Sequence, residues 1–162
     1  MLKPREASLH VYADASYAVH ADLKGHTGIV VTFGLDGGPV FCYSSKQRLI
    51  SKSSTEAELI ALDKSVGYLM AMTYFLEDLG IQVTPVHVYQ DNQSAIKLTE
   101  NGYSSMSKTK HIGIRYFYVK ERVDAGDIII HYKPTEELVA DFFTKPLIGN
   151  PFYTYRDVLH IV

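Results

Sequence analysis

In five short stretches of the chain, hydrophobic residues either alternate with polar ones, as in VHVYQD, or form short continuous runs, as in TGIVVTFG and DIIIHYKP. Valine, isoleucine, tyrosine and phenylalanine recur in these stretches. Alternation of this kind predicts β-strands that turn one face toward a core. Gly37 and Gly38 separate the second stretch from the third and allow the positive φ angles of a tight hairpin. The predicted strands are residues 8–14, 27–34, 39–44, 86–91 and 127–134.

A period near 3.6 residues replaces this alternation in the middle of the chain and predicts a helix of about 25 residues. Its apolar positions are Leu59, Leu62, Val66, Leu69 and Leu76. Ser53, Ser54 and Thr55 are candidate N-caps for this helix. Gly80 is a natural residue for its end. Shorter patterns predict three more helices over residues 92–102, 108–126 and 135–147.

The predicted order of elements is β-β-β-α-β-α-α-β-α. The early hairpin is antiparallel, whereas strands that alternate with helices imply parallel, right-handed crossovers. We therefore expect an α/β fold with a mixed sheet. The length of 162 residues favours a single domain over residues 1–162, with a core over about 8–147 and a C-terminal extension over 148–162.

Composition narrows the class of protein. The chain is 46% hydrophobic and 21% charged, which is typical of a globular protein, and no apolar run has the length of a membrane span. Cys42 is the only cysteine, which excludes an internal disulfide framework and a cysteine-rich zinc site. A net charge of -2 counts mildly against a dedicated nucleic-acid binder, unless an acidic pocket offsets a basic surface.

Two similar stretches, HVYADAS at 10–16 and HVYQDNQ at 87–93, each place an aspartate two residues after a tyrosine. If the first and fourth strands are parallel neighbours, Asp14 and Asp91 lie side by side at their carboxyl ends, where open α/β sheets bind ligands. Two adjacent aspartates repel each other, and a divalent cation is the usual reason for such a pair. The alternative is that both simply initiate turns.

Helical phase selects a third carboxylate. Glu58 lies near the edge of the apolar stripe, whereas Glu56 points away from it and suits a capping-box or helix-dipole role. Asp141 is a fourth candidate, because it lies among apolar residues in ELVADFFT. Four carboxylates would be balanced by two Mg²⁺ ions, an arrangement that serves in-line displacement at phosphorus.

Five motifs carry a resemblance to a known family. They are YADAS, SSKQRLISKSSTEAELIAL, YQDNQSAI, KTKHIGIRYFYVKERV and VADFFTKPL. In colinear order, from about residue 8 to residue 157, the chain resembles the ribonuclease H domain of copia-type LTR retrotransposon polyproteins. The family's four acidic positions fall on Asp14, Glu58, Asp91 and Asp141. A histidine-bearing loop of cellular ribonucleases H has no counterpart before Asp141.

This resemblance implies a ribonuclease H-like fold, with a five-stranded mixed sheet and helices on both faces. It also implies a metal-dependent endoribonuclease that hydrolyses the RNA strand of RNA:DNA hybrids during reverse transcription, with two Mg²⁺ ions or Mn²⁺ in their place. The neighbouring reverse transcriptase domain of the same polyprotein is the expected partner. We expect no membrane association, a monomer as an isolated domain, and a location in a cytoplasmic retrotransposon particle, with the nucleus as the alternative.

Small polar residues beside the carboxylates are candidates for contacts with RNA 2′-hydroxyl groups and phosphates. They are Ser16, Ser54, Thr55, Asn92 and Gln93. Ser54 and Asn92 suit helix capping equally well. On the helix that begins near residue 108, Lys108, His111 and Arg115 are candidates for a phosphate-binding stripe. The alternatives are a solvated helical face and, for His111, a hydrogen-bonded core histidine.

Three other functions stay open at this point. A non-catalytic domain of the same fold would only bind nucleic acid, and it would be free to lose a carboxylate. Another nuclease or integrase-like activity would use the same four acidic residues on a different substrate. A metal-binding signalling domain would explain the paired aspartates but not the leading hairpin.

Overall fold

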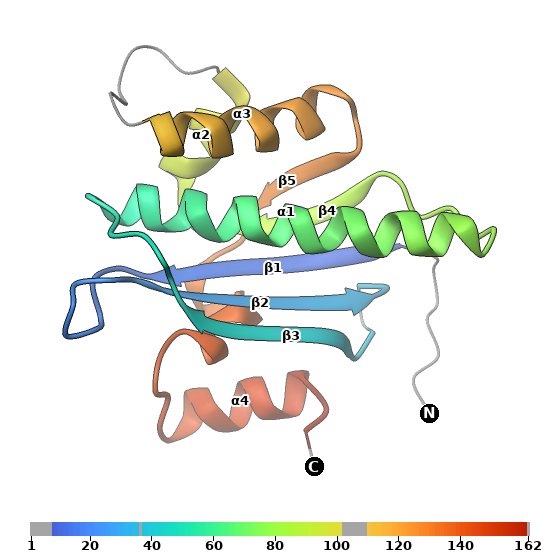
Figure 1. Ribbon diagram of the computed structural model, residues 1–162. Helices are drawn as coiled ribbons and strands as arrows, with labels where there is room; N and C mark the ends of the chain where they lie inside the picture. The colour runs from blue at the N-terminus through green and yellow to red at the C-terminus, as the bar shows by residue number, and fades with distance from the viewer. Residues whose placement is uncertain (1–7, 36, 102–109, 162) are drawn as a thin grey trace.

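The computed structural model describes residues 8–35, 37–101 and 110–161. Its centre is a five-stranded sheet with the strand order β3-β2-β1-β4-β5 (Figure 1). The strands are β1 (Leu9–Ser16), β2 (His26–Phe33), β3 (Pro39–Lys46), β4 (Val86–Gln90) and β5 (Ile128–Tyr132). These bounds agree with the five predicted strands to within two residues at each end. The expected mixed α/β sheet is therefore confirmed.

The register between β1 and β4 explains the repeated sequence pattern. The two strands are parallel neighbours, with His10 opposite His87 and Tyr12 opposite Tyr89. The two tyrosine rings stack with centroids 4.9 Å apart. Because side chains alternate along a strand, the next positions on this face are Asp14 and Asp91. The hairpin strands β2 and β3 are antiparallel to their neighbours, whereas β4 and β5 are parallel.

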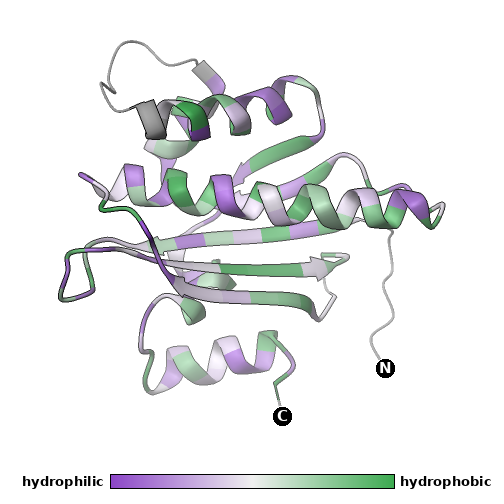
Figure 2. Cartoon of the chain, viewed as in Figure 1, coloured by the Kyte–Doolittle hydropathy of each residue, from purple (hydrophilic) through white to green (hydrophobic). Residues whose placement is uncertain are grey.

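Three helices cover one face of the sheet, and the C-terminal helix covers the other (Figure 1). On the first face lie α1 (Ser54–Asp78), α2 (Gln93–Asn101) and α3 (Lys110–Asp124). Their main core cluster includes Leu9, Val11, Ala13, Leu62, Val66, Leu69 and Val119. Hydrophobic and hydrophilic residues are interspersed along α1 in Figure 2, as expected for a helix with one buried side. On the second face lies α4 (Asn150–Val158).

The start of α1 has the cap that its sequence predicts. Ser53 is the N-cap, and its hydroxyl oxygen accepts a hydrogen bond from the Glu56 amide at 3.2 Å. The Glu56 carboxylate in turn accepts from the Lys52 amide at 2.6 Å. Glu56 therefore stabilises the helix end. By length and composition α1 would be apolar enough to cross a membrane, but it packs on the sheet with half of its apolar window buried, as a core helix does.

The prediction of one helix over residues 135–147 is wrong. This segment forms two short 3-10 helices, η1 (Thr135–Glu137) and η2 (Val139–Phe143), separated by Leu138 in an extended conformation. Pro134 and Pro146 bound the segment, and its apolar side chains pack directly on the sheet instead of along one helical stripe.

The packed core also extends beyond residue 147. Tyr155 and Leu159 of the expected C-terminal extension are buried against Tyr12, Val30 and Leu138. The last helix of the fold is therefore α4, which lies within that extension.

Candidate metal centre

Three carboxylates meet at the carboxyl ends of β1 and β4. One oxygen from each of Asp14, Glu58 and Asp91 lies within 4.8 Å of the other two. Asp14 comes from β1, Asp91 directly follows β4, and Glu58 reaches the group from the second turn of α1. The side chains of Asp14 and Glu58 are only 2% and 5% exposed, and Asp91 is half-buried. The structure thus joins residues that are 33 to 77 positions apart in sequence.

Burial makes these charges costly. Removal from water raises the pKa of Asp14 to about 6, and the charges of Asp141 and Asp91 act in the same direction. Burial also raises the pKa of Glu58 well above its ordinary value, with further contributions from the charges of Asp14 and Asp91. A cation bound among the three would remove this penalty, because an opposite charge favours the ionised form.

The donor set fits a hard divalent ion. All three ligands are carboxylate oxygens, which Mg²⁺ and Mn²⁺ prefer, and sulfur or imidazole donors are absent from this group. Asp91 remains partly open, which leaves room for water or a substrate oxygen at the edge.

Asp141 lies next to this group but is held differently. It is buried in η2, and its charge contributes to the raised pKa of Asp14. Its Oδ1 atom accepts a hydrogen bond from the Lys145 ammonium. Asp141 is therefore close enough to influence the three carboxylates without being one of the three oxygens that meet.

Sequence reasoning missed the residues that hold these carboxylates in place. Gln90 is fully buried, donates to Glu58 at 3.1 Å, and accepts from the Asp91 and Asn92 amides at 2.7 and 3.1 Å. The hydroxyl of Thr135 donates to Asp91 at 2.6 Å, and that of Thr144 donates to Asp14. Sequence signals existed for two of them, because Gln90 directly precedes Asp91 and Thr135 begins a predicted helix, whereas Thr144 had none.

Gly28 allows η2 to approach the sheet. It pairs with Asp14 across β1 and β2. A Cβ atom at this position would lie 2.6 Å from the Ala140 carbonyl oxygen and 2.7 Å from the Thr144 side chain. Both distances are too short for any real side chain, so this position requires glycine. The close approach brings Thr144 and Asp141 to Asp14.

The small polar residues predicted to contact nucleic acid have mixed surroundings. Ser54 and Gln93 are exposed, and Thr55 is half-buried. Asn92 caps α2, because its side-chain oxygen accepts from the Ala95 amide at 3.0 Å. Ser16 differs from these four, since it is buried and donates to the Thr144 carbonyl at 2.9 Å. Its hydroxyl has a structural partner within the chain.

Of the three residues of the predicted phosphate-binding stripe, Arg115 is the one whose side chain the structure describes, and it is paired with a carboxylate of the chain. Arg115 of α3 reaches α1, where its Nε atom donates to Asp63 at 3.0 Å, and its Nη1 atom is buried. This position indicates a structural role for Arg115 instead of a phosphate contact. Lys108 and the side chain of His111 lie outside the described residues.

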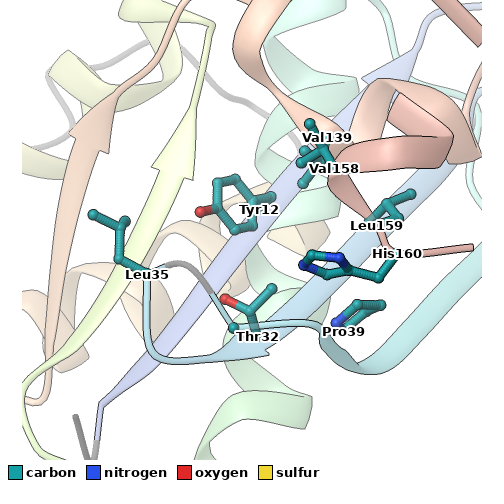
Figure 3. A pocket seen from close by; sticks show the side chains of 9 residues that line it. Tyr12, Thr32, Leu35, Pro39, Val139, Val158, Leu159 and His160 are labelled. Carbon is teal, nitrogen blue, oxygen red and sulfur yellow. The ribbon is translucent and has the colours of Figure 1, made fainter. Parts of the chain in front are cut away.

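A hollow of about 270 Å³ lies elsewhere, between the sheet and the end of α4 (Figure 3). Its lining is mostly apolar and contains none of the four carboxylates. The residues are Tyr12, Thr32, Leu35, Gly37, Pro39, Val139, Val158, Leu159 and His160. The hollow is therefore separate from the candidate metal centre.

Comparison with solved structures defines the class of fold. Ribonuclease H1 from Halobacterium salinarum superimposes with a TM-score of 0.59 at 17% identity, covering 84% of this chain and 93% of that one. The ribonuclease H1 LC11, solved in complex with an RNA/DNA hybrid, gives 0.63 at 18% identity, covering 84% and 93%. The ribonuclease H fold is thus established for this chain.

Sequence comparison identifies relatives of higher identity. No family model matches it. It is 34% identical to the retrovirus-related Pol polyprotein from transposon TNT 1-94 of Nicotiana tabacum and 32% identical to that from transposon RE1 of Arabidopsis thaliana. These matches cover 91% and 98% of this chain, which spans 11% of the length of each polyprotein. The chain is therefore similar in sequence to a segment of retrotransposon Pol polyproteins, and in this chain that segment has the ribonuclease H fold. The narrower copia-type assignment stays a prediction.

Proposed function

We propose that the chain is a divalent-metal-dependent endoribonuclease that hydrolyses the RNA strand of RNA:DNA hybrids during retrotransposon reverse transcription. The observation that carries this proposal is the meeting of Asp14, Glu58 and Asp91 within 4.8 Å at one edge of a ribonuclease H fold. Support also comes from the relatives, which are Pol polyproteins, and from a similar fold solved with a hybrid bound.

In this proposal the three carboxylates and Asp141 hold two Mg²⁺ ions, or Mn²⁺ in their place. When bound, the ions supply an activated water and charge stabilisation for in-line displacement at the phosphodiester. The chain's own contribution is to fix the carboxylates. Gln90 orients Glu58, and the hydroxyls of Thr135 and Thr144 orient Asp91 and Asp14. Their geometry favours one arrangement of oxygens before any ion arrives.

Hybrid recognition in this proposal uses the polar surface beside the carboxylates. Ser54 and Gln93 are exposed there, and Thr55 and Asn92 are half-buried. The start of α2 presents backbone N–H groups suited to phosphate, with Asn92 as its cap. Small donors and acceptors of this kind can read the 2′-hydroxyl groups in the shallow minor groove of a hybrid. Ser16 and Arg115 have partners within the chain and are not part of the proposed interface.

The remaining expectations form part of the same proposal. The proposed partner is the reverse transcriptase domain of the same polyprotein. This agrees with the comparisons, in which the chain spans only 11% of the length of each related polyprotein. The isolated segment is proposed to be a monomer. Its proposed location is the cytoplasmic retrotransposon particle, with the nucleus as the alternative.

A substrate-selection assay tests this function. A labelled RNA:DNA hybrid is compared with single-stranded RNA, double-stranded RNA and a DNA duplex of the same sequence, in Mg²⁺ and in EDTA. We expect cleavage of the RNA strand of the hybrid in Mg²⁺ alone, and loss of cleavage in Asp14→Asn. Asp22→Asn is the matched control, because Asp22 is an exposed carboxylate paired with Lys46 at 2.8 Å. Equal cleavage of the DNA duplex, or full activity in EDTA, would overturn the proposal.

A further inference from the structure

Lys145 brings a positive charge to the carboxylates from outside the pocket. It follows η2, and its ammonium donates to Asp141. The Lys145 side chain is 43% exposed, whereas that of Asp141 is 8% exposed. The lysine therefore reaches from the surface inward, and its flexible four-carbon stem allows the ammonium to move without a change in the backbone.

The charge of Lys145 acts on the carboxylates of Asp14 and Glu58 as well as on Asp141. Although burial raises the pKa of Asp14 and of Glu58, the Lys145 charge acts to lower both. Burial works to lower the pKa of Lys145 itself, but the hydrogen bond to Asp141 and the charges of Asp14 and Asp91 raise it overall. Lys145 is thus a built-in counter-ion for a cluster that is otherwise rich in negative charge.

The same ammonium distinguishes Asp141 from the other three carboxylates, because it is hydrogen-bonded to one oxygen of Asp141. Asp14, Glu58 and Asp91 already present oxygens to one common point. One oxygen of Asp141 is instead engaged by Lys145. A metal ion that used this oxygen would compete with the ammonium for it, so Asp141 can join the group fully only when Lys145 has another partner.

Substrate phosphate is the partner whose chemistry fits. Lysine ammonium groups bind phosphate through charge-assisted hydrogen bonds. A phosphodiester placed over the three carboxylates would bring its oxygens to the exposed end of Lys145. We propose that Lys145 transfers from Asp141 to a substrate phosphate and thereby frees Asp141 for metal binding. This inference rests on the proposed function, since it requires a site that takes both a divalent ion and a phosphodiester.

Such a transfer couples two binding events. If phosphate binding frees a metal ligand, then substrate tightens metal binding, and metal tightens substrate binding by the same factor. Without the ammonium, Asp141 would be free from the start and substrate would no longer change its availability. If Lys145 only forms an ion pair of the kind found on helix surfaces, its removal would leave this coupling intact.

The test measures Mn²⁺ affinity with and without a non-cleavable probe. The probe is an RNA:DNA hybrid whose RNA strand carries 2′-fluoro groups, checked by electrophoresis to remain intact. Isothermal titration gives the Mn²⁺ dissociation constant for the parent chain, Lys145→Met, Lys145→Gln and Lys145→Arg. The matched control is Lys120→Met, because Lys120 forms an exposed ion pair with Asp124 at the same four-residue spacing.

In the parent chain and the control, we expect the probe to tighten Mn²⁺ binding by about tenfold, within the usual range of coupling between sites. In Lys145→Met and Lys145→Gln the tightening should fall well below that of the parent, because only the direct contact between ion and phosphodiester is left to couple the two. In Lys145→Arg it should largely remain because the charge is kept. Circular dichroism checks that each variant is folded, and the two uncharged variants guard against misfolding of either one.

Two outcomes would overturn the inference in distinguishable ways. If the parent chain binds Mn²⁺ and cleaves natural hybrid, but Lys145→Met or Lys145→Gln keeps the parent's tightening, the role of Lys145 is refuted and the proposed function stands. If the parent chain binds no Mn²⁺ with or without the probe, both proposals are refuted.

Discussion

Replacing Asp14 with asparagine should stabilise the metal-free protein at neutral pH while it abolishes cleavage. Burial raises the folded-state pKa of Asp14 from its ordinary value of 3.8 to about 6. Holding the carboxylate ionised above that pH therefore costs about 3 kcal/mol of folding free energy. The introduced asparagine side chain would carry no charge and would still accept from Thr144. It would lie near the Glu58 and Asp91 carboxylates, which are acceptors for its new N–H groups.

The sign of the pH dependence is specific. Between pH 3.8 and about 6 the folded protein holds a proton on Asp14 that the unfolded chain has lost, so the Asp14 contribution to stability falls as pH rises. Asp14→Asn should therefore match the parent below pH 3.8 and gain progressively up to about pH 6. Loss of the Asp14 charge also relieves Glu58, whose pKa is raised mainly by burial and further by that charge. The loss of the buried Asp14 charge and the relief of Glu58 both stabilise the variant at neutral pH.

Urea unfolding in EDTA across this pH range measures the gain. At neutral pH we expect the variant to be more stable by about 3 kcal/mol, or about 6–12 °C in Tm for a domain of this size. The control Asp22→Asn should show the opposite trend, because its hydrogen bond to Lys46 lowers the pKa of Asp22 to about 2. If Asp14→Asn unfolds at the same or lower urea concentration than the parent at neutral pH, the raised pKa and the electrostatic account of the cluster are wrong.

The contacts around the cluster support three further predictions. Mg²⁺ at a hundred times its dissociation constant should stabilise the parent by about 2.7 kcal/mol in a thermal melt. Asp91→Asn should respond less, and an equal response would place the ion elsewhere. Gly28→Ala should lower stability by about 1–3 kcal/mol in urea unfolding and reduce hybrid cleavage, since a Cβ there meets η2 at 2.6 Å. The control Gly67→Ala in α1 meets nothing within 4 Å and should be neutral or stabilising; equal losses in both would contradict the packing argument. Gln90→Leu leaves the Asp91 and Asn92 amides without their acceptor, and it should cost about 1–3 kcal/mol in urea unfolding together with most of the cleavage activity. Unchanged stability would mean that water replaces the amide.

The positions of the carboxylates could be predicted from the sequence, because they follow from the regular periodicity of strands and helices. Two identical three-residue runs in parallel register bring Asp14 and Asp91 to the same edge. Helical phase distinguishes Glu58, which is buried in the site, from Glu56, which stabilises the helix end. Periodicity of this kind depends on backbone geometry alone, so it can be read without knowledge of tertiary contacts.

The supporting residues could not be predicted in the same way. Thr144 reaches Asp14 across 130 residues of sequence, and Gln90 joins β4 to α1. The two 3-10 helices have a helix-like composition, but η2 packs closely over Gly28 of the sheet. The position of Arg115 on its own helix predicts a phosphate ligand. Its ion pair with Asp63 of α1 is visible only in the folded structure, where the two helices pack together. Each of these outcomes depends on a long-range contact with no periodic signature.

The central claim is that Asp14, Glu58 and Asp91 form a divalent-cation site, and anomalous diffraction from crystals grown with Mn²⁺ tests it most directly. We expect an anomalous peak bonded to oxygens of these three carboxylates, and no peak there in crystals of Asp14→Asn grown under the same conditions. Ordered Mn²⁺ at other carboxylates, with none among these three in the parent protein, would contradict the account.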